Sequence, residues 1–385
     1  MENRSEQSRG RKRAQTVLIT LAGPFLRRLY AFRFQKAEGI DGPFLLVANH
    51  VTAADPVLLA IAMKGHLLYF VASEHLMQKG LGSKILRLVC DPIVRRKGDT
   101  AVKTVKEMLA TLKAGQNVAV FPEGSCSFNG QNEPFLPTIG KLAKAARCTL
   151  LTYRFEGGFF TLPRWGRGIR RGDYFGHVVR VYTPDELRGM TDGEVNAHIA
   201  EDLNEDAYAR IKARPVFYKS RHRAELLESA FFLCPNCRRV GTLRSKGDTI
   251  ACACGLKGTL DGQYTLHGLP ISTLIEWDRL QNGWLENTSG KPDFAFTDEG
   301  VTLWENDEAH RRKALVTGTM RMTREAFSVG DRSFPLSEIS NMELVRRNLL
   351  VFSTHDAHYQ VSGRDALNSR KYMMLYRIWK GVSNL

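Results

Sequence analysis

The 385-residue sequence has no apolar run of the ~18 to 20 residues that a transmembrane helix requires. The nearest candidate, residues 14–34, follows a basic run at 9–13 and is interrupted by Gly23-Pro24 and by three arginines. No small-residue cleavage site follows an apolar core long enough for a signal peptide. We therefore expect residues 1–34 to form a basic amphipathic segment that lies in a bilayer interface. The alternative is a helix packed on its own domain behind a disordered basic tail.

The sequence also lacks the paired cysteines of a disulfide framework and any excess of acidic residues. Its seven cysteines are an odd number and only four of them cluster, which favours a reducing compartment. Lys and Arg number 55 against 40 Asp and Glu, so the net charge is +15. We expect a polyanionic partner, which could be anionic lipid, nucleic acid or a phosphorylated substrate; charge alone does not choose among them.

Residues 35–220 alternate short apolar runs with helical stretches, as in an α/β domain whose central mixed sheet is flanked by helices. The chain is long enough for further domains beyond this one. Strands are predicted at residues 44–47, 67–71, 117–121, 149–155 and 178–181. Helices are predicted at residues 57–63, 101–112, 141–147 and 185–212.

The first strand-to-helix junction carries an imidazole and a carboxylate. His50 follows the strand at 44–47, and Asp55 is predicted as the N-cap of a helix with Pro56 as its first residue. A tight turn then lets both side chains converge at the carboxyl end of a strand, where open α/β sheets carry their chemistry. An imidazole oriented by a carboxylate can take a proton from a hydroxyl. The alternative is a plain helix cap beside an ordinary strand-end histidine.

Two later segments could complete this site. Pro122 ends the strand at 117–121 and Gly124 lets the backbone turn, which places Glu123 beside the His50 loop if the two strands are neighbours. Otherwise Glu123 is an exposed turn carboxylate. The cationic run 95–97, before a predicted helix start, is a natural anion site, although basic surface loops also produce such runs.

Four clustered cysteines indicate a small zinc ribbon at residues 230–262. The pairs Cys234/Cys237 and Cys252/Cys254 are separated by a predicted hairpin with its turn at Gly247-Asp248. Two thiolate pairs on a hairpin hold tetrahedral zinc in ribbon modules, and four protein ligands make such a zinc structural. The second pair has one spacer residue where two are usual, so buried thiols or an iron centre are the alternatives.

Residues 270–385 are predicted as a mostly-β, barrel-like domain closed by a C-terminal helix. A capping box begins a helix near Thr273, strand-like runs follow between 294 and 361, and Tyr372, Leu375, Tyr376 and Trp379 form a helical core stripe. This order resembles the pleckstrin-homology-like fold and indicates a binding module for lipid or protein. Nucleic acid is disfavoured because no aromatic and basic stacking platform stands out.

Three motifs together resemble those of the 1-acyl-glycerol-3-phosphate acyltransferase family of lysophospholipid acyltransferases. They are Asn49-His50-x4-Asp55, Pro92-Ile93-Val94-Arg95 and Phe121-Pro122-Glu123-Gly124-Ser125, in this order. The resemblance implies acyl transfer from acyl-CoA or acyl carrier protein to the hydroxyl of a lysophospholipid such as 1-acyl-glycerol-3-phosphate. It also implies a cytoplasmic enzyme bound peripherally to the anionic inner face of the cell membrane.

The resemblance further implies a role for each motif residue. His50 would be the general base for the acceptor hydroxyl and Asp55 its orienting partner, without a covalent acyl-enzyme. Arg95 would bind the acceptor's phosphate. The residues expected to bind substrate are Asn49, Arg95, Arg96, Glu123, Gly124 and Ser125.

The third motif departs from the family pattern at one informative position. Ser125 keeps the hydroxyl of the usual threonine, but Cys126 stands where the family has arginine. Losing that bidentate phosphate ligand would cost ~1.5 to 3 kcal/mol of acceptor binding unless Arg96, Lys97 or Arg154 replaces it. The alternatives are therefore a different acceptor, or a non-catalytic lipid-binding or scaffold protein on the same fold.

Overall fold

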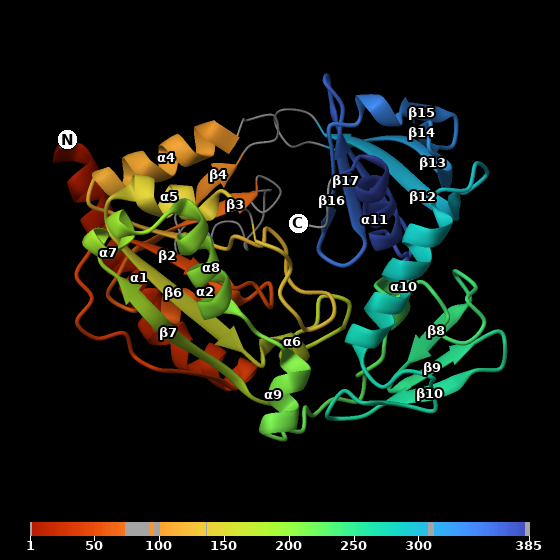
Figure 1. Cartoon of the computed structure of the whole chain (residues 1–385), viewed down its shortest axis with the longest axis horizontal. Coiled ribbons are helices and arrows are strands. Elements are labelled where there is room, and N and C mark those ends of the chain that lie inside the picture. Colours follow the sequence, from red (N-terminus) through yellow and green to blue (C-terminus); the bar gives the residue numbers. More distant parts are fainter. Residues whose placement is uncertain (1, 74–91, 96–100, 136, 307–311, 382–385) are drawn as a thin grey trace. The chain divides into compact units, whose positions relative to one another are not determined.

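The computed structural model describes residues 2–73, 92–95, 101–135, 137–306 and 312–381 (Figure 1). The chain divides into two compact units. The first runs to Pro163 and resumes over Ile169–Lys219, and the second comprises Arg164–Gly168 and Ser220–Asn384.

The first unit is built on a mixed seven-stranded sheet, as its alternating sequence pattern predicts. The strand order among the described residues is β1-β7-β6-β2-β5-β3-β4. Only the β6–β7 pair is antiparallel, so the carboxyl ends of β6, β2, β5, β3 and β4 meet at one edge. The strands are β1 Phe32–Phe34, β2 Phe44–Ala48, β3 Leu68–Ser73, β4 Ile93–Arg95, β5 Asn117–Val120, β6 Thr149–Glu156 and β7 Tyr174–Tyr182.

Helices cover both faces of this sheet because the central strand β2 is apolar at every position. Phe44, Leu46 and Ala48 face a core shared with α1 and α2, while Leu45 and Val47 face the core of α4, α5, α7 and α8 (Figure 1). A strand buried on both faces is typical of parallel sheets. The helices are α1 Glu2–Tyr30, α2 Asp55–Ala62, α4 Ala101–Lys113, α5 Ile139–Ala146, α6 Gly158–Thr161, α7 Pro184–Gly189, α8 Asp192–Leu203 and α9 Ala207–Ala213.

The amino-terminal helix α1 packs on the first unit by one face and exposes apolar side chains on the other. Ile19 is buried in the core beside α2. Val17, Leu21 and Phe25 are 58%, 75% and 67% exposed, and their spacing of four places them on one stripe. No helix among the described residues is long and apolar enough to cross a membrane. The segment predicted at residues 1–34 is helical only to Tyr30, because residues 32–34 form β1, which pairs with β7.

The second unit holds two antiparallel sheets with one helix between them in the chain. A four-stranded sheet has the order β11-β10-β9-β8, and a seven-stranded sheet has the order β15-β14-β13-β12-β18-β17-β16. The strands are β8 Leu243–Lys246, β9 Thr249–Cys252, β10 Lys257–Leu260, β11 Leu266–His267, β12 Phe296–Asn306, β13 Arg312–Met322, β14 Ala326–Val329, β15 Arg332–Pro335, β16 Asn341–Val345, β17 Leu349–Ser353 and β18 His358–Ser362.

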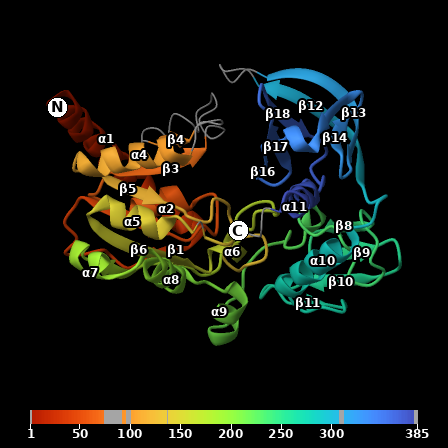
Figure 2. The same cartoon turned by 45° about the horizontal axis from the view of Figure 1, so that its top comes forward.

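Helix α10 (Leu274–Thr288) explains why these parts form one unit. Its Trp277 donates an indole hydrogen bond of 2.8 Å to the carbonyl of Leu233, beside the cysteine cluster. Its Asp278 accepts a bidentate pair at 2.7 and 3.1 Å from Arg370 of α11 (Arg370–Trp379), and both side chains are buried. Helix α11 lies beside β16 and β17 (Figure 2), and its predicted core stripe is confirmed by the burial of Tyr372 and of its neighbours.

Strand β12 contains a bulge. It continues through residues 298–300 with a register shift between Asp298 and Val301. Gly300 has a φ of +68°, the conformation that a bulge of this kind uses.

Candidate active site

His50 and Asp55 meet at the carboxyl end of β2, as predicted. The Nδ1 atom of His50 lies 2.9 Å from Oδ2 of Asp55, whose side chain is fully buried, while the imidazole is 18% exposed. The turn between them differs from the expectation by one residue, because Ala54 is the N-cap and Asp55 begins α2. The carboxylate therefore reaches back from the first helical turn to the strand end.

The Asp55 carboxylate is held by a full set of donors. Oδ2 accepts backbone N–H groups of Val51 at 2.7 Å and of Thr52 at 2.9 Å, and Oδ1 accepts the Thr52 hydroxyl at 2.6 Å. The Tyr174 hydroxyl donates to Oδ1 as well. Burial, with the nearby Asp55 charge, raises the pKa of Tyr174 well above its usual range, so this phenol remains a donor. Such a network fixes the carboxylate in the orientation that meets Nδ1.

The Asp55 contact leaves Nε2 as the reactive nitrogen of His50. With Nδ1–H donating to the carboxylate, the neutral ring presents Nε2 as a base. The ring stacks on Phe121 at 4.5 Å between centroids. Burial lowers the pKa of His50, but the charges of Cys126 and Asp55 outweigh it and hold that pKa well above its usual range.

Cys126 is the neighbour of that nitrogen. Its Sγ atom lies 3.4 Å from Nε2 of His50, and its side chain is half-buried in the loop after β5. Gly124 turns this loop with a φ of +67°, as predicted from its position after Pro122. From the sequence, Cys126 was notable only as the replacement of the usual arginine. A cysteine in a strand-end loop near a predicted histidine base was the signal that could have identified it.

Glu123 lies against the His50 loop, but it contacts backbone. Its Oε1 accepts the His50 N–H at 2.8 Å and the Asn132 side-chain amide at 2.9 Å, and its Oε2 accepts the Glu133 N–H at 2.8 Å. Burial raises the pKa of Glu123 to about 8 despite these three donors. With the Ser127 N–H donating to the His50 carbonyl at 3.2 Å, Glu123 ties the loops after β2 and β5 together.

Asn49 lies in the core, against the neighbouring strand β6. It is fully buried, its amide donates to the Phe155 carbonyl at 2.8 Å, and its oxygen accepts the Phe155 N–H at 2.7 Å. Both polar ends of the side chain are therefore used by the backbone of β6. Asn49 fixes the end of β2 against its neighbouring strand, and its expected contact with substrate stays a prediction.

The expected phosphate ligands are only partly described. Arg95 ends β4 at the sheet edge that also carries His50, because β4, β3, β5 and β2 are all parallel. Arg96 and Lys97 lie outside the described residues, so binding by Arg95 and Arg96 stays a prediction. Arg154 is engaged elsewhere, with its Nε 3.0 Å from Glu156. Ser125 follows Gly124 in the loop, and its predicted contact with substrate also stays a prediction.

Comparison with known proteins bears on the same part of the chain. Residues 19–156 match the family model described as Acyltransferase, which corresponds to 138 of the 385 residues. The first unit contains an acyltransferase-like domain. The solved 1-acyl-sn-glycerophosphate (LPA) acyltransferase PlsC from Thermotoga maritima is similar at 19% identity and a TM-score of 0.43, over 54% of this chain and 83% of that chain. Within the acyltransferase-like domain, the matched range holds His50, Asp55, Glu123 and Cys126.

Outside the acyltransferase-like domain, the second unit gathers four thiols. The Sγ atoms of Cys234, Cys237, Cys252 and Cys254 all lie within 4.8 Å of one another. The Sγ atoms of Cys234 and Cys254 lie 3.9 Å apart, and those of Cys237 and Cys252 lie 3.8 Å apart. The predicted hairpin is confirmed as β8 and β9, and the single spacer of the second pair does not prevent convergence.

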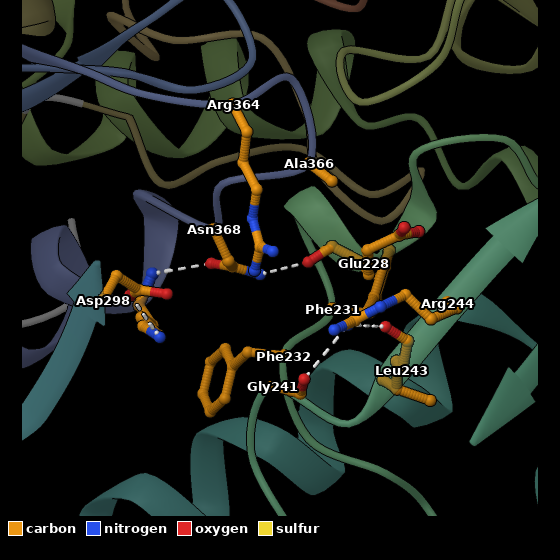
Figure 3. A pocket seen from close by; sticks show the side chains of 11 residues that line it. Glu228, Phe231, Phe232, Gly241, Leu243, Arg244, Asp298, Arg364, Ala366 and Asn368 are labelled. Atoms are coloured by element: carbon orange, nitrogen blue, oxygen red, sulfur yellow. Dashed lines mark hydrogen bonds and ion pairs between the residues drawn. The ribbon is translucent and has the colours of Figure 1, made fainter. Parts of the chain in front are cut away.

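A small pocket of the second unit is lined by polar and charged side chains that form ion pairs and hydrogen bonds with neighbouring groups (Figure 3). Lys371 Nζ lies 2.6 Å from Asp298, and the Asn368 side chain donates to the Glu228 carbonyl at 2.8 Å. Arg244 donates to the Leu243 carbonyl at 2.6 Å. The first of these contacts joins α11 to β12, and we assign the pocket a structural role.

Proposed function

We propose that this chain transfers an acyl group from acyl-CoA or acyl carrier protein to the hydroxyl of a lysophospholipid such as 1-acyl-glycerol-3-phosphate. The observation that carries the proposal is the His50–Asp55 pair, held at a strand end within an acyltransferase-like domain. The pair supplies an oriented base beside an accessible loop. The three motifs in their family order support the lysophospholipid as acceptor class.

In the proposed reaction, His50 Nε2 takes the proton of the acceptor hydroxyl as that oxygen attacks the acyl carbonyl. Asp55 stabilises the imidazolium that forms and holds the ring in one tautomer. General-base assistance of this kind contributes roughly 10²- to 10⁴-fold. Arg95 and Arg96 are proposed to bind the acceptor's phosphate, and the positioning of two bound substrates supplies further acceleration.

We also propose that α1 docks the enzyme on the anionic, cytoplasmic face of a membrane. The exposed stripe of Val17, Leu21 and Phe25 lies opposite the face that packs on the core. Arg13, four residues before Val17, and Arg28, three after Phe25, place cations at both ends of this stripe. An apolar stripe flanked by arginines fits a headgroup and acyl-chain boundary. The net charge of +15 favours the same partner.

For the second unit we propose a structural zinc ion held by Cys234, Cys237, Cys252 and Cys254. Tetrahedral zinc with Zn–S bonds of about 2.3 Å requires sulfurs about 3.8 Å apart. The 3.8 and 3.9 Å pairs fit that spacing. The ion would hold the hairpin of β8 and β9 against the loop at 234–237. Its four coordination positions would all be filled by cysteines, so none would be left for a reacting group. We further propose that the seven-stranded sheet with α11 is a pleckstrin-homology-like docking module, on the strength of its architecture.

A lipid-panel assay tests the proposed reaction against the non-catalytic alternative. Purified protein is incubated with an acyl-CoA and a set of lysophospholipids, and thiol release and lipid product are both measured. We expect a product with at least one lysophospholipid, lost in His50→Ala and kept in His355→Ala, whose side chain is 98% exposed. No product with any acceptor, or equal rates in wild type and His50→Ala, would overturn the proposal in favour of a scaffold protein.

A further inference from the structure

Three side chains of the first unit form a line of carboxylate, imidazole and thiol. Asp55 Oδ2 lies 2.9 Å from Nδ1 of His50, and Cys126 Sγ lies 3.4 Å from Nε2 on the opposite side of the ring. This is the arrangement in which a base activates a nucleophile and a third group orients the base. Cys126 is half-buried, so the residue is not sealed in the core.

The position of Cys126 bears on whether the thiol or the acceptor hydroxyl reacts first with the acyl donor. Nδ1 is committed to Asp55, so Nε2 is the atom that must serve an acceptor hydroxyl, and Cys126 already occupies its hydrogen-bonding direction. A direct transfer would need the hydroxyl to share that nitrogen with a thiol that is a better nucleophile. The electrostatic contact acts the same way, because Cys126 raises the pKa of the His50 imidazole that would take the proton of the thiol.

We propose that Cys126 accepts the acyl group from the donor thioester before the lysophospholipid receives it, so that transfer proceeds through an acyl-enzyme. This inference rests on the proposed function, since it concerns the path of the same acyl group. It differs from the direct transfer that the sequence resemblance implies. The departure from arginine at position 126 is then a gain of a nucleophile as well as a loss of a phosphate ligand.

The two steps balance without any further reactant. In the first, the Cys126 thiolate attacks the donor carbonyl, a carbon–sulfur bond forms to Cys126, and the donor's carbon–sulfur bond breaks. The departing thiolate takes the proton from Nε2 of the His50 imidazolium. In the second, neutral His50 takes the proton of the acceptor hydroxyl, its oxygen attacks the acyl-Cys126 carbonyl, and the Cys126 thiolate leaves beside the imidazolium.

The decisive experiment omits the acceptor. The full-length protein is incubated with an acyl-CoA and isotopically labelled free CoA, and label appearing in acyl-CoA is followed. The acid-quenched protein is examined by intact mass and peptide mapping. We expect exchange of label without any lysolipid, and one acyl group on Cys126 that neutral hydroxylamine removes, as it removes thioesters. A direct, sequential transfer gives neither result.

Matched variants assign the effect to this thiol. Cys126→Ala is expected to lose the adduct and the exchange, and to slow lysolipid acylation by at least about 10²-fold. Cys126→Ser is expected to slow both steps, because a serine hydroxyl is ionised far less readily. Cys148→Ala, a cysteine buried in the core against α5 and α8, is expected to retain adduct and exchange.

The outcomes separate this inference from the proposed function. If lysolipid is acylated while the wild type shows no adduct and no exchange, and Cys126→Ala keeps the wild-type rate, the acyl-enzyme is overturned and the proposed function stands. An adduct on Cys126 with no transfer to any lysolipid supports the acyl-enzyme and overturns the acceptor class. An adduct on another cysteine, unaffected in Cys126→Ala, overturns the inference.

Discussion

The hydroxyl of Tyr174, on β7, donates a hydrogen bond to Oδ1 of Asp55, a residue 119 positions earlier in the chain. Both side chains are fully buried. The bond links β7 to the carboxylate that contacts His50, so the proposed catalytic pair is held by a residue outside its own loop. The Thr52 hydroxyl, from the same loop as His50, donates to the same oxygen at 2.6 Å and also holds the carboxylate in place.

Tyr174→Phe should lower kcat by roughly 10-fold and leave KM for both substrates nearly unchanged. A hydrogen bond to a charged acceptor contributes about 1.5 to 3 kcal/mol, and Thr52 keeps part of the restraint. Steady-state kinetics on the acylation assay provides the measurement. Tyr153→Phe is the matched control, because the Tyr153 hydroxyl is buried and has no partner among the described residues. Equal losses of kcat in both variants would show that Tyr174 merely packs.

The stability of the wild type should fall as pH rises from about 4.5 to about 8, with Glu123 as one cause. Burial raises the pKa of Glu123 to about 8, so in this range the unfolded chain has lost a proton that the native state keeps. Native stability therefore decreases by about 1.4 kcal/mol per pH unit for this group. Glu205, whose pKa burial raises to about 7, acts in the same direction.

Glu123→Gln isolates the Glu123 contribution to this slope. The stability difference between wild type and variant should shrink steadily toward pH 8, because glutamine does not titrate. Urea unfolding at half-unit pH steps measures it. A difference that stays constant across the range would mean that Glu123 is ionised in the native state throughout, held by its three N–H donors.

Zinc should be present at about one equivalent per chain and should stabilise the second unit. Cys237→Ser is expected to lose the metal and to lower the midpoint of thermal unfolding by roughly 10 °C, since a ligand of the fold is removed. The Cys148→Ala variant should bind zinc as the wild type does, because Cys148 lies outside the cluster of four cysteines. Elemental analysis and calorimetry provide the two measurements. Less than about half an equivalent of zinc in the wild type would contradict the assignment.

Membrane binding should depend on the exposed stripe of α1. Replacing Leu21 and Phe25 together by glutamine keeps helix propensity and removes two apolar groups that are 75% and 67% exposed. Each such group contributes up to roughly 1.5 to 3 kcal/mol when buried, so partitioning should fall by more than about 10-fold. Co-sedimentation with vesicles rich in phosphatidylglycerol measures it. Val102→Gln, at an apolar position on α4 that is 58% exposed, should bind as the wild type does. Unchanged partitioning of the double variant would refute the docking role.

The sequence predicted the parts of the site that depend on local order. His50, Asp55 and Glu123 each follow or precede an apolar strand by a few residues, and parallel neighbouring strands bring such positions to one edge. These local positions were sufficient to predict that the His50–Asp55 pair and the Glu123 loop lie together. It also placed the cysteine hairpin, because thiol spacing and a Gly-Asp turn are local signals.

The remaining features depended on tertiary contacts that no local pattern encodes. Tyr174 contributes from a strand whose register on β6 decides which side chain faces Asp55. The two hydrogen bonds between the Asn49 amide and the backbone of Phe155 join residues 106 positions apart, which no local pattern indicates. Cys126 was recognised as a departure, but its contact with Nε2 depends on the turn at Gly124. The edge strands β1, β15 and β16 form because a neighbouring strand pairs with them.

The most direct test of the account is single-turnover acylation of the accepted lysophospholipid by wild type and by His50→Asn. Asparagine keeps an N–H donor toward Asp55 and removes the base at Nε2, so the fold and substrate binding should persist. We predict a fall in the transfer rate of at least about 10²-fold, with His355→Asn at the wild-type rate. Transfer by His50→Asn at the wild-type rate would contradict the central claim that this imidazole, oriented by Asp55, drives the chemistry.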